Sequence, residues 1–126
     1  MIIKTSKLIG DALDWAVQAA QYDYPLDEVW EYRNDAFKPS TNWAQGGPII
    51  ERERLGLEYD REWVYDPAAQ DPDDEPDNGD RWRADYNVGG YQHLSEYGPT
   101  PLIAAMRCYV ASKLGDEVEV PDELLS

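Results

Sequence analysis

The amino-acid sequence predicts an α+β domain in which two amphipathic helices pack on one face of a small antiparallel sheet. Apolar residues recur at helical spacing near both ends of the chain, and short alternating stretches lie between them. The 126 residues, 42% of them apolar, supply enough apolar surface for one core. We therefore expect a single domain over residues 1–126.

The first helix is predicted over Ser6–Gln21. Its apolar residues recur every three or four positions and so form one stripe, which consists of Leu8, Ala12, Leu13, Ala16, Val17 and Ala20. Ser6 is the expected N-cap, and Asp11 and Asp14 lie near the start, where negative charge suits the helix dipole. Residues 2–3 ahead of this helix are expected to form a short strand.

The next part of the chain is predicted as short strands and turns. Trp30-Glu31-Tyr32 alternates and indicates a strand. Gly46-Gly47-Pro48 indicates a turn, because glycine and proline are the residues that most often interrupt regular structure. Ile49–Glu53 then indicates a second strand, with Pro48 at its first position.

A long acidic segment separates the strands of a predicted hairpin. Leu57–Tyr65 and Arg81–Tyr86 alternate, so we expect them to pair in antiparallel fashion. Between them, Asp66–Asp80 holds seven acids and three prolines but no basic or aromatic residue. Such a composition buries too little apolar surface to offset the entropy of ordering, so we expect a mobile insertion. Gly89-Gly90 indicates a further hairpin turn or bulge.

The last helix carries the clearest start and stop signals. Thr100 is the expected N-cap, Pro101 suits the first helical position, and Gly115 suits the position after the helix. The apolar stripe consists of Leu102, Ile103, Met106, Tyr109, Val110 and Leu114. The residues expected in the core are Trp15, Met106, Tyr109 and Val110. A short strand over Val118–Val120 is expected to follow.

The charge of the chain restricts what it can bind. Twenty-six acids against eleven bases leave a formal net charge of -15. A field this negative repels nucleic acid and anionic lipid and attracts basic protein surfaces, so we expect no direct nucleic-acid binding. No apolar run is long enough for a membrane span. The single cysteine, Cys108, and the lack of a secretory signal favour a reducing cytoplasm.

No motif in the sequence specifies a reaction. A nucleophile and base would have to be Ser95 or Cys108 with His93, and no catalytic motif surrounds any of them. A hydrogen-bonded structural histidine and a buried cysteine are the simpler interpretation. Carboxylate pairs are so numerous that none is diagnostic. We therefore expect a protein that is not an enzyme.

Metal binding is not expected either. One cysteine and one histidine cannot supply the ligands of a zinc site. Asp73, Glu75 and Asp77 have the spacing that begins a calcium-binding loop, but Asn78 occupies the position that requires glycine, and Ala84 that of the bidentate glutamate. We expect no dedicated metal site and no cofactor.

A family resemblance rests on three stretches of the sequence. They are Leu13–Val17, Trp43–Glu51 and Gly98–Val110. Together they are similar to the NinX family of small tailed-phage proteins, found among the accessory genes of lambdoid phages. The resemblance covers most of the chain in order, although the acidic segment contributes least to it. It implies a phage origin and the cytoplasm of a bacterial host, and it carries no catalytic residue to transfer.

The acids suggest how such a protein would act. Seven lie within residues 11–35, ten within 58–80 and five within 116–123. Gathered on one face, they would occupy a groove built for a phosphate backbone, on a basic nucleic-acid-binding host or defence protein. The residues predicted to contact the partner are Glu58, Asp60, Glu62, Asp71, Asp73, Asp74, Glu75, Asp77 and Asp80. A simpler interpretation is an acidic surface that only keeps the protein soluble.

The inhibitory part of this hypothesis comes from phage context, because accessory phage genes often encode inhibitors of restriction enzymes or the CRISPR machinery. Two alternatives remain. One is a small ligand-binding domain or enzyme that uses the aromatic surface around Trp43 and the Gly46-Gly47-Pro48 turn, for which a deep apolar pocket would be evidence. The other is a homo-oligomeric structural or regulatory protein, for which an apolar patch at a symmetric interface would be evidence.

Overall fold

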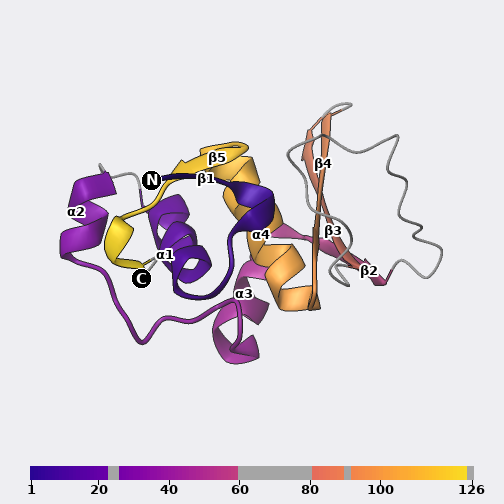
Figure 1. The fold of residues 1–126 in the computed structure, drawn as a ribbon. Helices are drawn as coiled ribbons and strands as arrows, with labels where there is room; N and C mark the ends of the chain where they lie inside the picture. Colours follow the sequence, from indigo (N-terminus) through magenta and orange to yellow (C-terminus); the bar gives the residue numbers. More distant parts are fainter. Residues whose placement is uncertain (23–25, 60–80, 90–91, 125–126) are drawn as a thin grey trace.

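In a computed structural model of the protein, the structure describes residues 1–22, 26–59, 81–89 and 92–124. Figure 1 shows the elements in space. In chain order they are β1 (Ile2–Lys4), the 3-10 helix η1 (Thr5–Lys7), α1 (Gly10–Gln21), α2 (Leu26–Glu31), α3 (Trp43–Glu53), β2 (Gly56–Tyr59), β3 (Trp82–Gly89), β4 (Gln92–Gly98), α4 (Pro101–Leu114), β5 (Glu117–Glu119) and the 3-10 helix η2 (Asp122–Leu124). Helices combined with antiparallel sheets confirm the α+β class.

Helix α4 lies at the centre of the fold (Figure 1). It packs on the sheet formed by β2, β3 and β4 on one side and on α1 on the other. Because it is covered on both sides, every residue from Leu102 to Ala111 is buried. The predicted core residues Trp15, Met106, Tyr109 and Val110 are all at most 2% exposed, which confirms them.

The three-stranded sheet confirms the predicted antiparallel pairing as far as Tyr59, and residues 60–65 of the predicted first strand lie outside the described residues. Strand β2 pairs with β3 in antiparallel register, with Leu57 opposite Ala84. Strand β4, which the sequence analysis did not predict, pairs with the other edge of β3, and the register shifts between Asn87 and Gly89. This irregularity lies at the predicted turn or bulge. The expected acidic insertion at 66–80 lies outside the described residues.

The two ends of the described chain form a second, two-stranded sheet. Strand β1 pairs with β5, and Ile3 lies opposite Val118. Both strands were predicted, and their pairing brings the N-terminal segment against the C-terminal one (Figure 1). This pairing joins two segments that lie more than a hundred residues apart in the sequence.

The predicted turn and the strands at Trp30–Tyr32 and Ile49–Glu53 are wrong. Trp30 lies in α2, and Gly46-Gly47-Pro48 lies within helix α3 together with Ile49–Glu53. The Asn42 side chain begins α3 by accepting a hydrogen bond from the Ala44 N–H at 2.9 Å. Such a cap stabilises the start of α3, but it is worth less than the helix-propensity penalty of two glycines and a proline, so tertiary packing has to stabilise the rest of the helix.

Close packing around Gly46 requires a glycine at this position of α3. A Cβ atom at this position would collide with the Pro39 carbonyl oxygen and lie 2.6 Å from Leu102 Cδ2. The glycine therefore allows α3 to approach both the preceding segment and α4 closely, which is a requirement of packing and not of a turn.

Helix α1 begins at Gly10, so the predicted N-cap at Ser6 is wrong. The residues ahead of it form the short 3-10 helix η1 and are also held by tertiary hydrogen bonds. Thr5 Oγ1 donates to the Gly115 carbonyl at 2.6 Å, and the Leu8 carbonyl accepts from Arg107 Nε at 2.8 Å. For α4, in contrast, the caps are confirmed. The Thr100 hydroxyl accepts from the Ile103 N–H at 3.1 Å, and Gly115 follows the helix.

Candidate functional site

The exposed carboxylates of β5 and η2 form one edge of the molecule, which we call the C-terminal acidic edge. It consists of Asp116, Glu117, Glu119, Asp122 and Glu123, all of which are exposed. Strand alternation creates this edge, because Val118 faces the core at 4% exposure while its two neighbours face solvent. Five carboxylates thus lie within eight consecutive residues.

The N-terminal segment borders this edge. In the register of the β1–β5 pair, Ile2 lies opposite Glu119 and Lys4 opposite Glu117. The Met1 amine lies 3.4 Å from Glu119 Oε1 and 3.2 Å from Asp122 Oδ1. It compensates part of the negative charge, and the Asp122 hydrogen bond is the main reason that the pKa of this amine is raised.

Two carboxylates of the edge take part in no ion pair among the described residues. Asp116 and Glu117 form no ion pair with any residue in the described part of the chain. They also lie at the end nearest Gly115, away from the Met1 amine. The edge therefore keeps an excess of negative charge that faces solvent.

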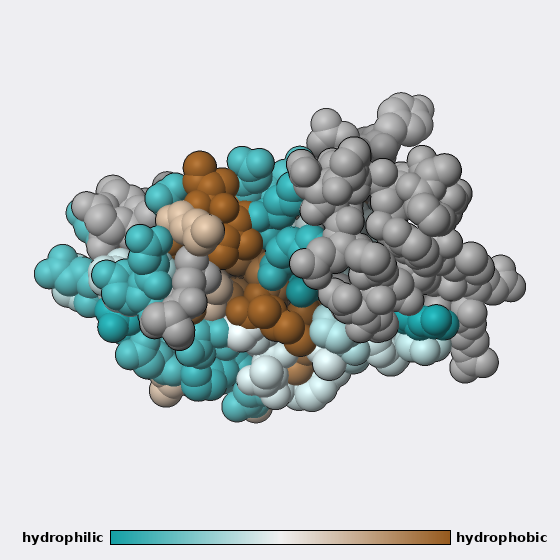
Figure 2. Space-filling view, in the orientation of Figure 1, coloured by the Kyte–Doolittle hydropathy of each residue, from teal (hydrophilic) through white to brown (hydrophobic). Residues whose placement is uncertain are grey.

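Exposed apolar side chains accompany the acidic edge. Met1 is 66% exposed, Ile2 62% and Ile9 55%, and all three belong to the N-terminal segment. Figure 2 shows an apolar band on the face that carries this segment, bordered by hydrophilic residues. Carboxylates beside exposed apolar groups are a suitable surface for a partner that is both basic and partly apolar.

Of the residues predicted to contact a partner, only Glu58 lies in the described part of the chain. It forms an ion pair with Arg83, whose Nε also lies 3.3 Å from Asp85 Oδ2. Glu58 is therefore part of an ion-pair cluster on the β2–β3 pair and not an uncompensated carboxylate. The other predicted contacts lie outside the described residues; they are Asp60, Glu62, Asp71, Asp73, Asp74, Glu75, Asp77 and Asp80.

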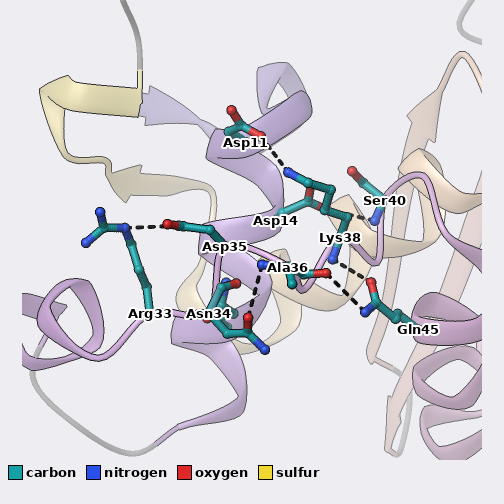
Figure 3. Close-up of polar contacts among 10 residues, drawn as sticks. Asp11, Asp14, Arg33, Asn34, Asp35, Ala36, Lys38, Ser40 and Gln45 are labelled. Atoms are coloured by element: carbon teal, nitrogen blue, oxygen red, sulfur yellow. Dashed lines mark hydrogen bonds and ion pairs between the residues drawn. The ribbon is translucent and has the colours of Figure 1, made fainter.

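Two acids of the first cluster, Asp11 and Asp14, serve the structure (Figure 3). Asp14 is 5% exposed and accepts a hydrogen bond from the Ser40 N–H at 2.9 Å. Burial raises the pKa of its carboxyl, and the Ser40 N–H opposes this rise. Asp11 lies 3.3 Å from Lys38 Nζ, so its charge is also compensated.

The segment that follows α2 is fixed by similar contacts (Figure 3). Arg33 Nε lies 3.1 Å from Asp35 Oδ1. The Gln45 side chain accepts from the Lys38 N–H at 2.6 Å and donates to the Ala36 carbonyl at 3.2 Å. The Gln45 contacts tie an irregular segment to the start of α3, and the one acid of this segment, Asp35, is paired with Arg33.

The two candidate nucleophiles have structural contacts in the described part of the chain. Cys108 is buried, its Sγ lies 3.8 Å from the Leu94 carbonyl, and burial raises the pKa of its thiol to about 12. This confirms the interpretation of Cys108 as a buried structural residue. Ser95 Oγ donates to Asp85 Oδ1 at 2.7 Å. The side chain of His93 lies outside the described part.

Among the described residues, no three His, Cys, Asp or Glu side chains lie close enough together to hold a metal ion. The acids with calcium-loop spacing, Asp73, Glu75 and Asp77, lie outside this part. No described helix has the length and apolar character to cross a membrane.

The C-terminal acidic edge could have been predicted from the sequence, although the acids predicted to contact a partner lie within 58–80 instead. Val118 and Val120 alternate with Glu119, which places the carboxylates on one face. What the sequence does not contain is the pairing with β1, which brings Met1 and Ile2 beside them.

The chain matches a known protein family over most of its length. The sequence model of a family described as "Bacteriophage P22, NinX" matches residues 4–113. This range includes α1, α3 and all but the last residue of α4, and it ends before the C-terminal acidic edge. No curated protein matches the chain.

Proposed function

The chain belongs to the bacteriophage P22 NinX family, and on this premise we propose that it binds and inhibits a basic, nucleic-acid-binding protein of the bacterial host or its anti-phage defences. In this proposal the protein is not an enzyme and acts in the host cytoplasm. Restriction enzymes and the CRISPR machinery belong to the partner class, because they hold nucleic acid on basic surfaces.

The observation that supports this proposal is the C-terminal acidic edge. Asp116 and Glu117 are exposed carboxylates without an ion-pair partner among the described residues, in a chain with a net charge of -15. A basic partner surface would supply the missing positive charges. The exposed Met1 and Ile2 beside the edge add apolar contact area, which gives a complex its lifetime while charge accelerates its formation.

The mechanism in this proposal is steric and electrostatic blocking. A row of carboxylates occupies the groove that would otherwise hold phosphates, and the body of the domain prevents nucleic acid from entering. The acids at 71–77, whose predicted role in the contact stays a prediction, are a second candidate for the same blocking role in this proposal.

Affinity purification from the host, with its defence systems present, tests the proposal. The protein is immobilised, bound proteins are identified by mass spectrometry at low and high salt, and duplex DNA is added as a competitor. We expect one basic nucleic-acid-binding complex that salt releases and DNA displaces. Recovery of scattered basic proteins alone would favour the interpretation of an acidic surface that only maintains solubility.

Charge-matched variants separate a specific contact from net charge. The double variant Asp116→Asn, Glu117→Gln removes two negative charges from the edge, and Glu28→Gln, Glu31→Gln removes two exposed charges from α2. We expect only the edge variant to weaken binding of the purified partner, by about tenfold or more. Ala or Asn replacements throughout 71–77 test the acidic segment in the same assay.

A further inference from the structure

A cavity lies where the C-terminal ends of three helices meet. Its volume is about 500 Å³, and it is lined by the last residues of α1, α3 and α4. The side chains that matter are Tyr22, Arg52, Glu53, Tyr109 and Lys113. None of them belongs to the C-terminal acidic edge or to the residues predicted to contact a partner.

Arg52 is held in place at this cavity. Its guanidinium carbon lies 6.0 Å from the centre of the Tyr109 ring, and its Nε lies 3.7 Å from Glu53 Oε1. Glu53 in turn accepts a hydrogen bond from the Tyr86 hydroxyl at 3.5 Å. Tyr109 and Glu53 thus restrict the guanidinium directly, and Tyr86 acts on it only through Glu53, which lowers the entropy lost when Arg52 binds a ligand.

Lys113 brings a second positive charge to the same cavity. It follows Tyr109 by one helical turn, is exposed, and forms no ion pair with the described residues. Arg52 and Lys113 each lie in the last turn of a helix, where the partial negative charge of the carbonyl end stabilises a cation but repels an anion, so the two side chains supply the attraction for a ligand. Among the described lining residues, two cations thus accompany one carboxylate, Glu53.

The uncharged side chain of Tyr109 lines the cavity. The residue is 2% exposed, and burial raises the pKa of its phenol, so it stays protonated at neutral pH. Leu114 and Ala20 add apolar surface, and Tyr22 contributes an aromatic ring that is half exposed. The volume lies within the range of cavities that hold small organic ligands.

We propose that this cavity binds a small organic oxyanion. The phosphate or carboxylate of the ligand accepts hydrogen bonds from Arg52 and Lys113, and its apolar or planar part lies against Tyr22 and Leu114. A guanidinium and an ammonium group together suit the several lone pairs of such an anion. The site is independent of the inhibitory function proposed above.

Nuclear magnetic resonance titration of the ¹⁵N-labelled protein tests this site. The probes are adenosine monophosphate, benzoate and uncharged adenosine, each up to about 10 mM. We expect saturable shifts at residues 19–22, 52–53 and 109–114 with one or both anions and none with adenosine. The two anions distinguish a preference for phosphate from one for carboxylate.

Variants connect the binding to the two cations. Lys113→Gln and Arg52→Gln should each lower the affinity for the anion by about tenfold, because each removes a charge-assisted hydrogen bond. Lys7→Gln and Arg54→Gln are matched controls, exposed and absent from the cavity lining, and should change affinity by less than about twofold. Lys113 is exposed, so its replacement preserves the fold even if that of Arg52 does not.

The proposal is wrong if neither anion gives saturable shifts at these residues. It is equally wrong if adenosine binds as well as its monophosphate, or if Lys113→Gln leaves the affinity unchanged while the fold is intact.

Discussion

Arg107 connects separate parts of the molecule through one buried side chain. It is 4% exposed, its Nε donates to the Leu8 carbonyl at 2.8 Å, and its Nη1 donates to the Tyr97 carbonyl at 2.9 Å. It thereby joins the N-terminal segment to the end of β4. The apolar stripe of α4 does not reveal this role, because an arginine outside the stripe is expected to face solvent. Only the covering of α4 on both sides buries it.

Replacement of Arg107 tests this connection. We expect Arg107→Met to lower the free energy of unfolding by roughly 3 kcal/mol, because two buried carbonyls lose their donor and nearby Glu96 loses a compensating charge. Urea unfolding followed by circular dichroism measures the change. Arg54→Met, at an exposed position, is the control; equal stability of the two variants would contradict the assigned role.

Glu96 makes stability depend on pH near neutrality. Burial raises the pKa of its carboxyl from 4.5 to about 7; the charge of Arg107 opposes this, and that of Asp116 adds to it. Between pH 4.5 and about 7, the Glu96 carboxyl keeps its proton in the folded state but loses it in the unfolded state. The free energy of unfolding therefore declines as the pH rises through this range.

We expect Glu96→Gln to remove this decline. At pH 8 the variant should be more stable than the parent by on the order of 2 kcal/mol, and at pH 4 the two should be similar. Chemical unfolding at a series of pH values provides the comparison, with exposed Glu28→Gln as the control. A parallel pH profile for parent and Glu96→Gln would show that another group is responsible.

Helices α3 and α4 differ in how far the sequence alone predicts them. The bounds of α4 follow from local signals, because Thr100 and Gly115 cap the helix through contacts within a few residues. The bounds of α3 depend on tertiary packing. Gly46 fits against Pro39 and Leu102, and this contact between distant positions has no counterpart in local propensity. The sequence pattern therefore predicted a turn where a helix exists.

Adjacent glycines in α3 offer a matched test of this explanation. We expect Gly46→Ala to lower the free energy of unfolding by roughly 1–3 kcal/mol, because its methyl group would enter occupied space. Gly47→Ala meets nothing within 4 Å and should raise stability by about 0.5–1 kcal/mol through better helix propensity. Thermal unfolding measures the stability of both variants relative to the parent protein. A Gly46→Ala variant that is more stable than the parent would show that α3 is not packed as described.

At the scale of the whole molecule, the sequence predicted the sign of the surface charge but not its arrangement. The acid clusters were visible, yet Asp14 is buried, Asp11 is paired with Lys38, and Glu58 is paired with Arg83. Sequence position does not distinguish these acids from those of the C-terminal acidic edge. The difference arises from tertiary contacts, which assign some carboxylates to folding and leave others facing solvent.

This arrangement predicts how the protein associates with its proposed partner. We expect the association rate to fall by at least about tenfold between low and physiological salt, and the dissociation rate to change little. Stopped-flow measurements with the purified partner test this. Ile2→Ser should act on the opposite step and accelerate dissociation, since Ile2 is an exposed apolar neighbour of the edge. Association that is insensitive to salt would contradict an electrostatic contact.

The pairing of β1 with β5 has a consequence for biosynthesis. Residues 2–4 leave the ribosome more than a hundred residues before their partner strand, residues 117–119. Until then the inner faces of Ile3 and Leu8 lack the cover that the finished domain provides. The domain therefore closes only after residue 119 has been translated, and a nascent chain that stalls before position 117 exposes residues 2–8 to chaperones and proteases.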